Sequence, residues 1–196
     1  MTPSLEKLLR DLERFGAEND EVITQRPRRM LNITRDTGEF LGVLVRACRA
    51  REVLEIGTSN GYSTLWLAEA AKPLGGRVRT VEMSEFKAGL ADENFFHSGL
   101  ADAITLITAD AAKVLAETAD GSVDLLFLDA EREQYCALWP DLRRVLRPDG
   151  GLLVVDNAVS HAEQLVDFMA LVGTDAEFRC SLVPVGNGEF LAVRGS

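Results

Sequence analysis

Three oxygen-bearing side chains end two apolar runs in the second half of the chain. Asp129 ends the run VDLLFLD at 123–129, and Asp156 and Asn157 end GLLVVDN at 151–157. Two carboxylates and a carboxamide oxygen suit a divalent ion and leave positions open for water or substrate, with Mg²⁺ as the natural candidate. The alternative is that Asp129 caps the next helix and that Asp156 and Asn157 form a polar turn. Taken together, the three residues favour the metal site.

A glycine-bracketed segment follows the first apolar run. The sequence EIGTSNGYS at 55–63 is typical of a strand end, a loop and a helix start. Glycine lets a ligand approach the backbone closely, and the amides at a helix N-terminus attract a negative group. The dinucleotide fingerprint GxGxxG is absent, so a carboxylate or single anion is favoured over a pyrophosphate. The alternative is an ordinary turn in which glycine serves packing alone.

Acidic residues also follow the second and third apolar runs. Glu82 fits hydrogen bonds to both hydroxyls of a ribose, although such a residue is often only a cap for the helix that begins at Ser84. Asp110 fits the N-cap of a helix that begins at Ala111, a partner for an adenine amino group, or both roles at once. These two carboxylates therefore indicate a binding site only in combination with the glycine loop.

Short apolar runs alternate with helical patterns from residue 52 onward. Their near-continuous hydrophobicity is typical of strands covered on both faces, as in a parallel sheet. The last two runs flank the turn signal at 186–188, which predicts an antiparallel hairpin. We therefore predict an α/β fold with a doubly wound, mostly parallel seven-stranded sheet in a single domain over 1–196. The predicted helices lie within 1–50 (the second at about 36–49) and at 62–71, 84–97, 110–118, 131–145 and 160–172, and the parallel strands within 51–196 lie at 53–56, 78–82, 104–108, 123–129 and 151–157.

The first N-terminal helix carries a leucine stripe. Leu5, Leu8 and Leu12 recur at helical spacing, with Ser4 as the expected N-cap and Gly16 as the expected stop. Such a stripe either covers the protein's own sheet or offers a surface to a second copy of the chain.

Charge and composition narrow the expected partners and location. With 21 Lys and Arg against 31 Asp and Glu, the net charge of −10 repels phosphate backbones and anionic membrane surfaces, so we expect neither nucleic acid nor membrane as a partner. The N-terminal stretch has no signal-peptide core, and no segment reaches the roughly 20 apolar residues of a membrane span. Three cysteines without CxxC spacing favour a reducing compartment. These features predict a cytoplasmic protein.

Together, these segments resemble the cation-dependent class I O-methyltransferases, the family that contains catechol and caffeoyl-CoA O-methyltransferases. The resemblance runs nearly end to end and is most specific in VLEIGTSNGYSTLWLA at 53–68. The other similar segments are DTGEFL at 36–41, Glu82, ADA at 109–111, LFLDAEREQY at 126–135, VVDN at 154–157 and LVPVGNGEFLAVR at 182–194.

The resemblance implies a Rossmann-like fold that binds S-adenosylmethionine. Gly57, Thr58 and Ser63 would hold its methionine end with Glu55 beneath the loop, and Glu82 would take the ribose hydroxyls. Met83, Asp110 and Ala111 would surround the adenine, Tyr135 would lie near the cofactor, and residues 30–33 would lie over the methionine portion and the acceptor. The implied metal ligands are Asp129, Asp156 and Asn157.

The chain departs from the family pattern beside the metal ligands. The family motif D-A-D-K-x-x-Y has a lysine that is assigned as a base, whereas Glu131 and Arg132 stand at its acidic and lysine positions. Arginine does not release its proton at working pH, so Arg132 would orient or stabilise an oxyanion. The base role would pass to the metal-lowered pKa of the acceptor, to Glu131 or to solvent. Asp129 and Arg132 are the expected catalytic residues.

The predicted function is methyl transfer from S-adenosylmethionine to a hydroxyl of a small catechol-like or vicinal-diol acceptor, assisted by a divalent metal. A cation that chelates two hydroxyls favours the oxyanion of a phenol whose pKa is otherwise about 10. The substrate-recognition loop that family members often insert after Asp-Asn is missing, which predicts an open pocket and disfavours a CoA thioester. The resemblance also implies a homodimer.

Three alternatives to this function stay open at the level of sequence. The first is a metal-independent methyltransferase that acts on another small-molecule nucleophile. The second is a methyltransferase-fold binding protein with weakened catalysis. The third is a nicotinamide dehydrogenase, which the missing GxGxxG disfavours.

Overall fold

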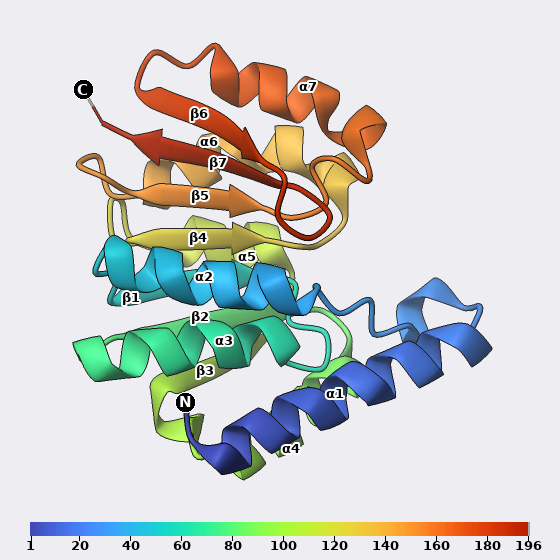
Figure 1. Ribbon diagram of the computed structural model, residues 1–196. Coiled ribbons are helices and arrows are strands. Elements are labelled where there is room, and N and C mark those ends of the chain that lie inside the picture. The colour runs from blue at the N-terminus through green and yellow to red at the C-terminus, as the bar shows by residue number, and fades with distance from the viewer. Residues whose placement is uncertain (196) are drawn as a thin grey trace.

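A seven-stranded sheet organises the protein in the computed structural model, which describes residues 1–195 (Figure 1). The strand order is β3-β2-β1-β4-β5-β7-β6. Strands β1 to β5 pair in parallel, whereas β7 pairs antiparallel with both β5 and β6. The predicted doubly wound sheet with a C-terminal hairpin is confirmed. The strands are β1 (Glu52–Ile56), β2 (Arg77–Glu82), β3 (Ile104–Thr108), β4 (Leu125–Leu128), β5 (Leu152–Val155), β6 (Phe178–Val183) and β7 (Glu189–Arg194).

The apolar runs form central strands because helices cover both faces of the sheet. Every residue of β4 and β5 is buried, so neither face of these strands meets water. Two hydrophobic cores result, one on each face of the sheet (Figure 1). The first core includes α1 (Pro3–Val22), α2 (Arg35–Ala47), α3 (Tyr62–Ala71) and α4 (Glu85–Ser98), and the second includes α5 (Ala111–Glu117), α6 (Tyr135–Val145) and α7 (Ala162–Gly173).

Helix α1 continues past the predicted stop. Gly16 is buried inside the helix, and a β-carbon there would lie 2.5 Å from Nδ2 of Asn32. The glycine therefore serves the close approach of the returning chain and does not end the helix. The N-cap is Thr2 and not Ser4, because the Thr2 side chain accepts a hydrogen bond from a backbone amide of the first turn at 3.3 Å.

The leucine stripe of α1 faces the protein's own interior. Leu5 and Leu12 are buried in the first core, and Leu8 packs against it. Helix α1 packs against α3 and α4, so the stripe is buried within the protein and is not available as a dimer surface.

Two helices begin later than the sequence suggests. The helix expected from residue 131 begins at Tyr135 after a short 3-10 turn at Arg132–Gln134, and the helix expected from residue 160 begins at Ala162. The extra irregular residues stay at the carboxyl ends of β4 and β5. Strand order reverses between β1 and β4, and in such sheets the crevice outside the carboxyl ends at this point is the usual ligand position.

Two further features concern the chain as a whole. Cys48, Cys136 and Cys180 are all free cysteines, with Cys136 and Cys180 exposed. Among the helices of residues 1–195, none combines the length and the apolar character that crossing a bilayer requires.

Candidate active site

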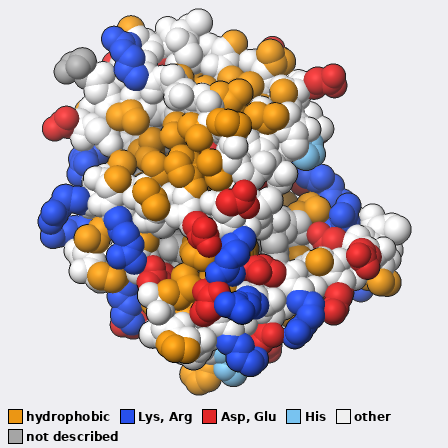
Figure 2. All heavy atoms as spheres, in the orientation of Figure 1, with side chains coloured by type: hydrophobic (Ala, Val, Ile, Leu, Met, Phe, Trp, Pro, Cys, Tyr) orange, Lys and Arg blue, Asp and Glu red, His pale blue; other side chains and the backbone are white. Residues whose placement is uncertain are grey.

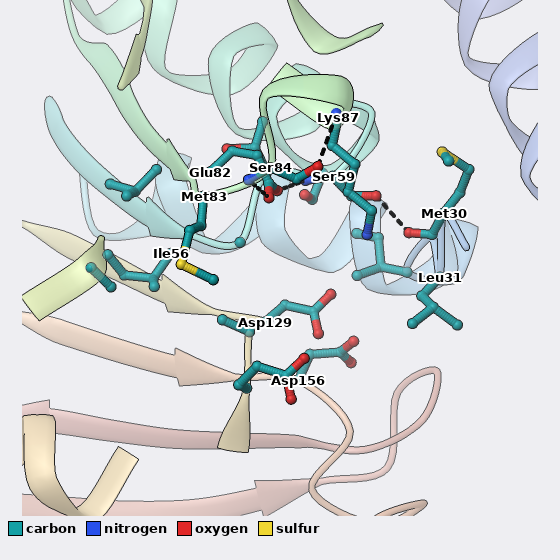
Figure 3. A pocket seen from close by; sticks show the side chains of 18 of the residues that line it. Met30, Leu31, Ile56, Ser59, Glu82, Met83, Ser84, Lys87, Asp129 and Asp156 are labelled. Atoms are coloured by element: carbon teal, nitrogen blue, oxygen red, sulfur yellow. Dashed lines mark hydrogen bonds between the residues drawn. The ribbon is translucent and has the colours of Figure 1, made fainter. Parts of the chain in front are cut away.

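A cavity of about 550 Å³ opens at the carboxyl ends of β1, β2, β4 and β5 (Figure 3). The loop at 57–63 forms one wall, and the segment that precedes α2 forms another. The turns after β4 and β5 close the end that carries Asp129 and Asp156. Of the residues predicted for the site, the cavity is lined by Gly57, Thr58, Ser63, Glu82, Met83, Asp110, Ala111, Asp129, Arg132, Asp156 and Asn157.

Gly57 lies where two strand ends come into contact. Ile56 pairs with Leu128 across β1 and β4, so Gly57 and Asp129 are the residues that directly follow this last pair on the two strands. Gly57 has φ of +104°, and a β-carbon on it would lie 2.0 Å from the carbonyl oxygen of Asp129. Only glycine fits this position. Gly57 therefore has the packing role that the sequence left open as an alternative, and it also lines the cavity.

Glu55 supports the loop from below. It is fully buried and accepts hydrogen bonds from the hydroxyls of Ser63 at 2.5 Å and Thr80 at 2.6 Å, and from that of Thr64. Burial raises its pKa to about 7 despite these donors. Glu55 does not line the cavity and lies beneath the loop, where the resemblance placed it. Because its strand position faces the first core, its role is to hold the hydroxyls of the loop and of the start of α3.

Glu82 ties the glycine loop to the end of β2. Its two carboxylate oxygens accept backbone hydrogen bonds from Ser59 at 2.8 Å and from Ser84 at 2.9 Å (Figure 3). These bonds fix the carboxylate at the cavity wall and leave further lone pairs for a ligand. The residue therefore combines the capping function with the geometry that a ribose partner needs.

The adjoining wall contains Met83, Asp110 and Ala111. Asp110 caps α5 by accepting hydrogen bonds from the amides of Ala112 at 2.8 Å and Lys113 at 3.4 Å, and it also lines the cavity. Both roles that the sequence allowed are thus compatible in one side chain.

The segment before α2 covers the cavity through backbone contacts. The Ser59 hydroxyl donates to the carbonyl of Met30 at 2.6 Å (Figure 3). The Asp20 carboxylate accepts from the amides of Met30 at 2.7 Å and Leu31 at 2.8 Å. Leu31 has φ of +52°, a conformation that these contacts hold in place. Asp20 was missed by sequence reasoning, because its partners lie in a turn with no local signal.

Asp129, Asp156 and Asn157 meet at the ends of β4 and β5. The Asn157 Nδ2 group donates to Oδ1 of Asp129 at 3.3 Å and to Oδ2 of Asp156 at 2.7 Å. The three predicted ligands are therefore brought together. The orientation of the amide differs from the expectation, however, since its nitrogen and not its oxygen faces the carboxylates. Carboxylate oxygens only accept hydrogen bonds, so the Asn157 NH₂ group, which donates, turns toward them.

The charge state of this cluster fits a cation. Burial, followed by repulsion from Asp156, raises the pKa of Asp129 to about 8. The pKa of Asp156 is raised as well, chiefly by burial, although a side-chain hydrogen bond with Glu189 acts to lower it. Within residues 1–195, no group of three or more His, Cys, Asp or Glu side chains is arranged for a metal ion. A cation here would thus rely on the two aspartates and the Asn157 oxygen after rotation of the amide.

Glu189 is a third carboxyl group behind the cluster, and sequence reasoning missed it. Val155 lies opposite Phe190 in the antiparallel pair, so Asp156 and Glu189 are the next facing residues. Glu189 is fully buried and accepts a hydrogen bond from the Thr37 hydroxyl at 3.0 Å. Burial, and then the charge of Asp156, raise its pKa to about 10. The turn at 186–188 predicts the C-terminal hairpin, but it does not predict that β7 pairs with β5 and so brings Glu189 next to Asp156.

Arg132 lines the cavity, whereas Tyr135 lies beneath it. Arg132 donates through Nη1 to the Gln164 side chain at 3.3 Å. The Tyr135 hydroxyl accepts from the Ala130 amide at 2.7 Å and donates to its carbonyl at 3.2 Å. Tyr135 is buried outside the cavity lining, next to the lining residues Ala130 and Gln134. Its first-turn position in α6 aims the ring into the second core, so it pins the turn that carries Asp129.

Comparison with known proteins decides the family. A family model described as O-methyltransferase matches residues 6–195. The chain belongs to this O-methyltransferase family. The resemblance inferred from the strand-end residues is thereby confirmed.

Individual relatives support the assignment. The chain is 33% identical over 138 residues to a catechol O-methyltransferase of Niastella koreensis, covering 69% of this chain and 62% of that protein. It is 39% identical over 127 residues to a catechol O-methyltransferase of Mycobacterium tuberculosis, covering 65% and 57%. It thus spans about three fifths of the length of these two relatives. The solved O-methyltransferase of Bacillus cereus in complex with SAH has a TM-score of 0.80 and 27% identity, covering 99% of this chain and 91% of that one.

Proposed function

We propose that the protein is an S-adenosylmethionine-dependent O-methyltransferase that acts on a small vicinal-diol acceptor of the catechol type with help from a divalent cation. One observation carries the proposal: Gly57 and Asp129 are in backbone contact, so the glycine loop and the oxygen-rich cluster share one cavity. The family assignment and the SAH complex of one relative support the methyl donor, and the catechol names of two others support the acceptor.

In this proposal the glycine-loop side binds the methyl donor. The loop backbone at Gly57 and Thr58 and the Ser63 side chain would receive its methionine end, and the Glu82 carboxylate would receive the ribose hydroxyls. Met83 and Asp110 would border the adenine. When bound, the donor supplies an electrophilic methyl group on a sulfonium, and the protein's contribution is to hold an acceptor oxygen in line with that group.

The cluster side would hold the cation and the acceptor. Two neighbouring carboxylates that repel each other, with a carboxamide in contact with both, fit a cation bound by Asp129, Asp156 and Asn157. Such an ion supplies Lewis acidity that favours the acceptor oxyanion. Arg132 keeps its proton, so it contributes positive charge at the acceptor end of the cavity and takes no proton from the acceptor. The acceptor proton would leave to Glu131 or to solvent at the exposed rim.

A second candidate is methyl transfer without a metal, and one observation favours it. The Asn157 amide already donates to both aspartates, which satisfies much of their hydrogen-bonding capacity in the absence of an ion. In that case Arg132 alone would stabilise the oxyanion, and activity would survive a strong chelator.

The deciding experiment measures donor binding and methyl transfer separately. Calorimetry should show S-adenosylhomocysteine binding with or without Mg²⁺, whereas turnover of catechol should require Mg²⁺ and stop with EDTA. Asp129→Asn should lower kcat/KM for catechol roughly 100-fold or more while keeping S-adenosylhomocysteine binding. Asp92→Asn, an exposed change on α4, is the matched control. Unchanged turnover with EDTA and in Asp129→Asn would select the metal-independent candidate.

We also propose that the protein is a homodimer and is located in the cytoplasm. Hydrophobic side chains gather beside α2 over the open face of the C-terminal strands (Figure 2). In this region Val43 of α2 is 60% exposed and Val193 of β7 is 40% exposed. A patch of this kind supports a homodimer, which light scattering of Val193→Glu against wild type would test. The free cysteines support a reducing, cytoplasmic environment.

A further inference from the structure

Two arginines and a histidine lie at the end of the cavity that holds the aspartates. Arg26, Arg132 and His161 line the cavity together with Asp129 and Asp156. The two arginines come from distant parts of the chain, Arg26 from the turn before α2 and Arg132 from the turn after β4. Three carboxylates of the same lining, those of Asp129, Glu131 and Asp156, stand beside these two guanidinium groups, so any anion binding here rests on the individual guanidinium groups and not on a net positive field.

Arg132 has a guanidinium that is free to bind an anion. Its one side-chain hydrogen bond within residues 1–195 goes to the neutral amide of Gln164 at 3.3 Å, and it takes part in no ion pair there. The side chain is half-buried, so its charge is only partly screened by water. A carboxylate that reached it would form a charge-assisted, two-point hydrogen bond.

Arg26 lines the same cavity, where it forms an exposed ion pair with the neighbour of Arg132. Its Nε atom is 3.6 Å from Oε1 of Glu131, and the two side chains are 56% and 57% exposed. An exposed pair of this kind is weak and rearranges readily. Burial, and then the charges of Arg132 and Arg26, lower the pKa of His161, which indicates that the three side chains act on the same region. A neutral His161 adds a hydrogen-bond donor or acceptor there.

We infer that the acceptor is an aromatic vicinal diol that also carries a carboxylate, which Arg132 and Arg26 bind while the hydroxyls face Asp129 and Asp156. This inference rests on the proposed function and names its substrate class. The planar fork of a guanidinium matches a carboxylate, and the same charges repel an amine. An anionic diol is therefore preferred over a neutral one, and a cationic diol is disfavoured.

The test uses three acceptors of similar size that differ in the charge of the side chain. They are 3,4-dihydroxyphenylacetate, 4-ethylcatechol and dopamine, whose saturated linkers limit the electronic effect on the ring hydroxyls. The full-length wild-type protein with Mg²⁺ should show kcat/KM highest for the anion, by about tenfold over the neutral acceptor, and lowest for the cation. Calorimetry of each acceptor with the S-adenosylhomocysteine complex supplies a readout that does not need turnover.

Three variants and a control separate the arginines from general charge effects. Arg132→Gln and Arg26→Gln should each reduce the ratio of anion to neutral acceptor, and Arg132→Glu should reverse the order so that dopamine exceeds the anion. Arg10→Gln, at an exposed position of α1 outside the cavity lining, should keep the wild-type ratio. Binding of S-adenosylhomocysteine and the thermal melting curve verify that each variant is folded.

The outcomes keep this inference distinct from the proposed function. Turnover of 4-ethylcatechol without preference for the anion, or a preference that persists in both arginine variants, overturns the inference and leaves the proposed function standing. If none of the three acceptors is methylated, the proposed function fails. The calorimetric ratio then still decides whether the cavity selects an anionic ring.

Discussion

A β-carbon on Gly57 would lie 2.0 Å from the carbonyl oxygen of Asp129. The contact arises because β1 and β4 are neighbours in parallel register, so their carboxyl ends leave the sheet side by side. It couples the loop proposed to bind the methyl donor to the turn proposed to bind the acceptor. A change at one side is therefore transmitted to the other through the backbone.

Gly57→Ala should destabilise the protein and abolish tight donor binding. The added β-carbon requires both a shift of the β4 end and a positive φ, which together cost at least about 1–3 kcal/mol. Urea unfolding gives the stability, and calorimetry with S-adenosylhomocysteine gives the affinity. Gly89→Ala is the control, since no atom lies within 4 Å of its β-carbon position inside α4. That control should be neutral or slightly stabilising, and equal behaviour of the two variants would refute the contact.

Glu82→Gln should weaken S-adenosylhomocysteine binding by roughly tenfold or more. The carboxylate accepts from the amides of Ser59 and Ser84, and a carboxamide can replace only one of its two acceptor oxygens. Loss of that oxygen loosens the glycine loop and removes a ribose acceptor. Calorimetry provides the measurement, with the exposed neighbour Glu85→Gln as control. An affinity equal to that of wild type would remove Glu82 from the donor site.

The stability of the metal-free protein should fall as the pH rises from about 5 to 9. The pKa of Glu189 is about 10 in the folded protein against 4.5 for an ordinary glutamate, so folding takes up a proton in this interval. The stabilisation from this group is complete below about pH 4.5 and is lost as the pH approaches 10, with a slope of at most about 1.4 kcal/mol per pH unit.

Glu189→Gln should flatten this dependence, because a neutral amide keeps the shape and the hydrogen bond from Thr37 without a titrating proton. Unfolding by urea at pH 5, 7 and 9 in EDTA gives the slopes. Glu93→Gln, an exposed change on α4, should run parallel to wild type. Parallel slopes for all three proteins would show that Glu189 is not a buried acid.

Tyr135→Phe should lower stability by about 1–3 kcal/mol, because the Ala130 amide and carbonyl both lose the hydroxyl that pairs them. S-adenosylhomocysteine affinity should change little, since the ring lies outside the cavity. The kcat for catechol should fall more, because the freed turn carries Asp129. A drop in S-adenosylhomocysteine affinity as large as the drop in kcat would instead favour a direct contact between Tyr135 and the donor.

Local sequence patterns determined the frame of this protein. The first three apolar runs end at the residues where β1, β2 and β3 end, and the last two extend one or two residues past β4 and β5. The polar residues at or just beyond these strand ends, Glu82, Asp110 and Asp129, line the cavity. This part was predictable because burial on both faces leaves a continuous apolar run, and parallel strands bring their carboxyl ends to one edge.

Only the tertiary structure decided which of these residues face the cavity and which support it. Packing places the side chains of Glu55 and Tyr135 beneath the cavity lining. Glu189 meets Asp156 only because β7 pairs antiparallel with β5 in one particular register, and Arg26 meets Glu131 only because the segment before α2 crosses the cavity. Strand register and chain crossing are set by contacts between distant segments, and no local pattern of residues encodes them.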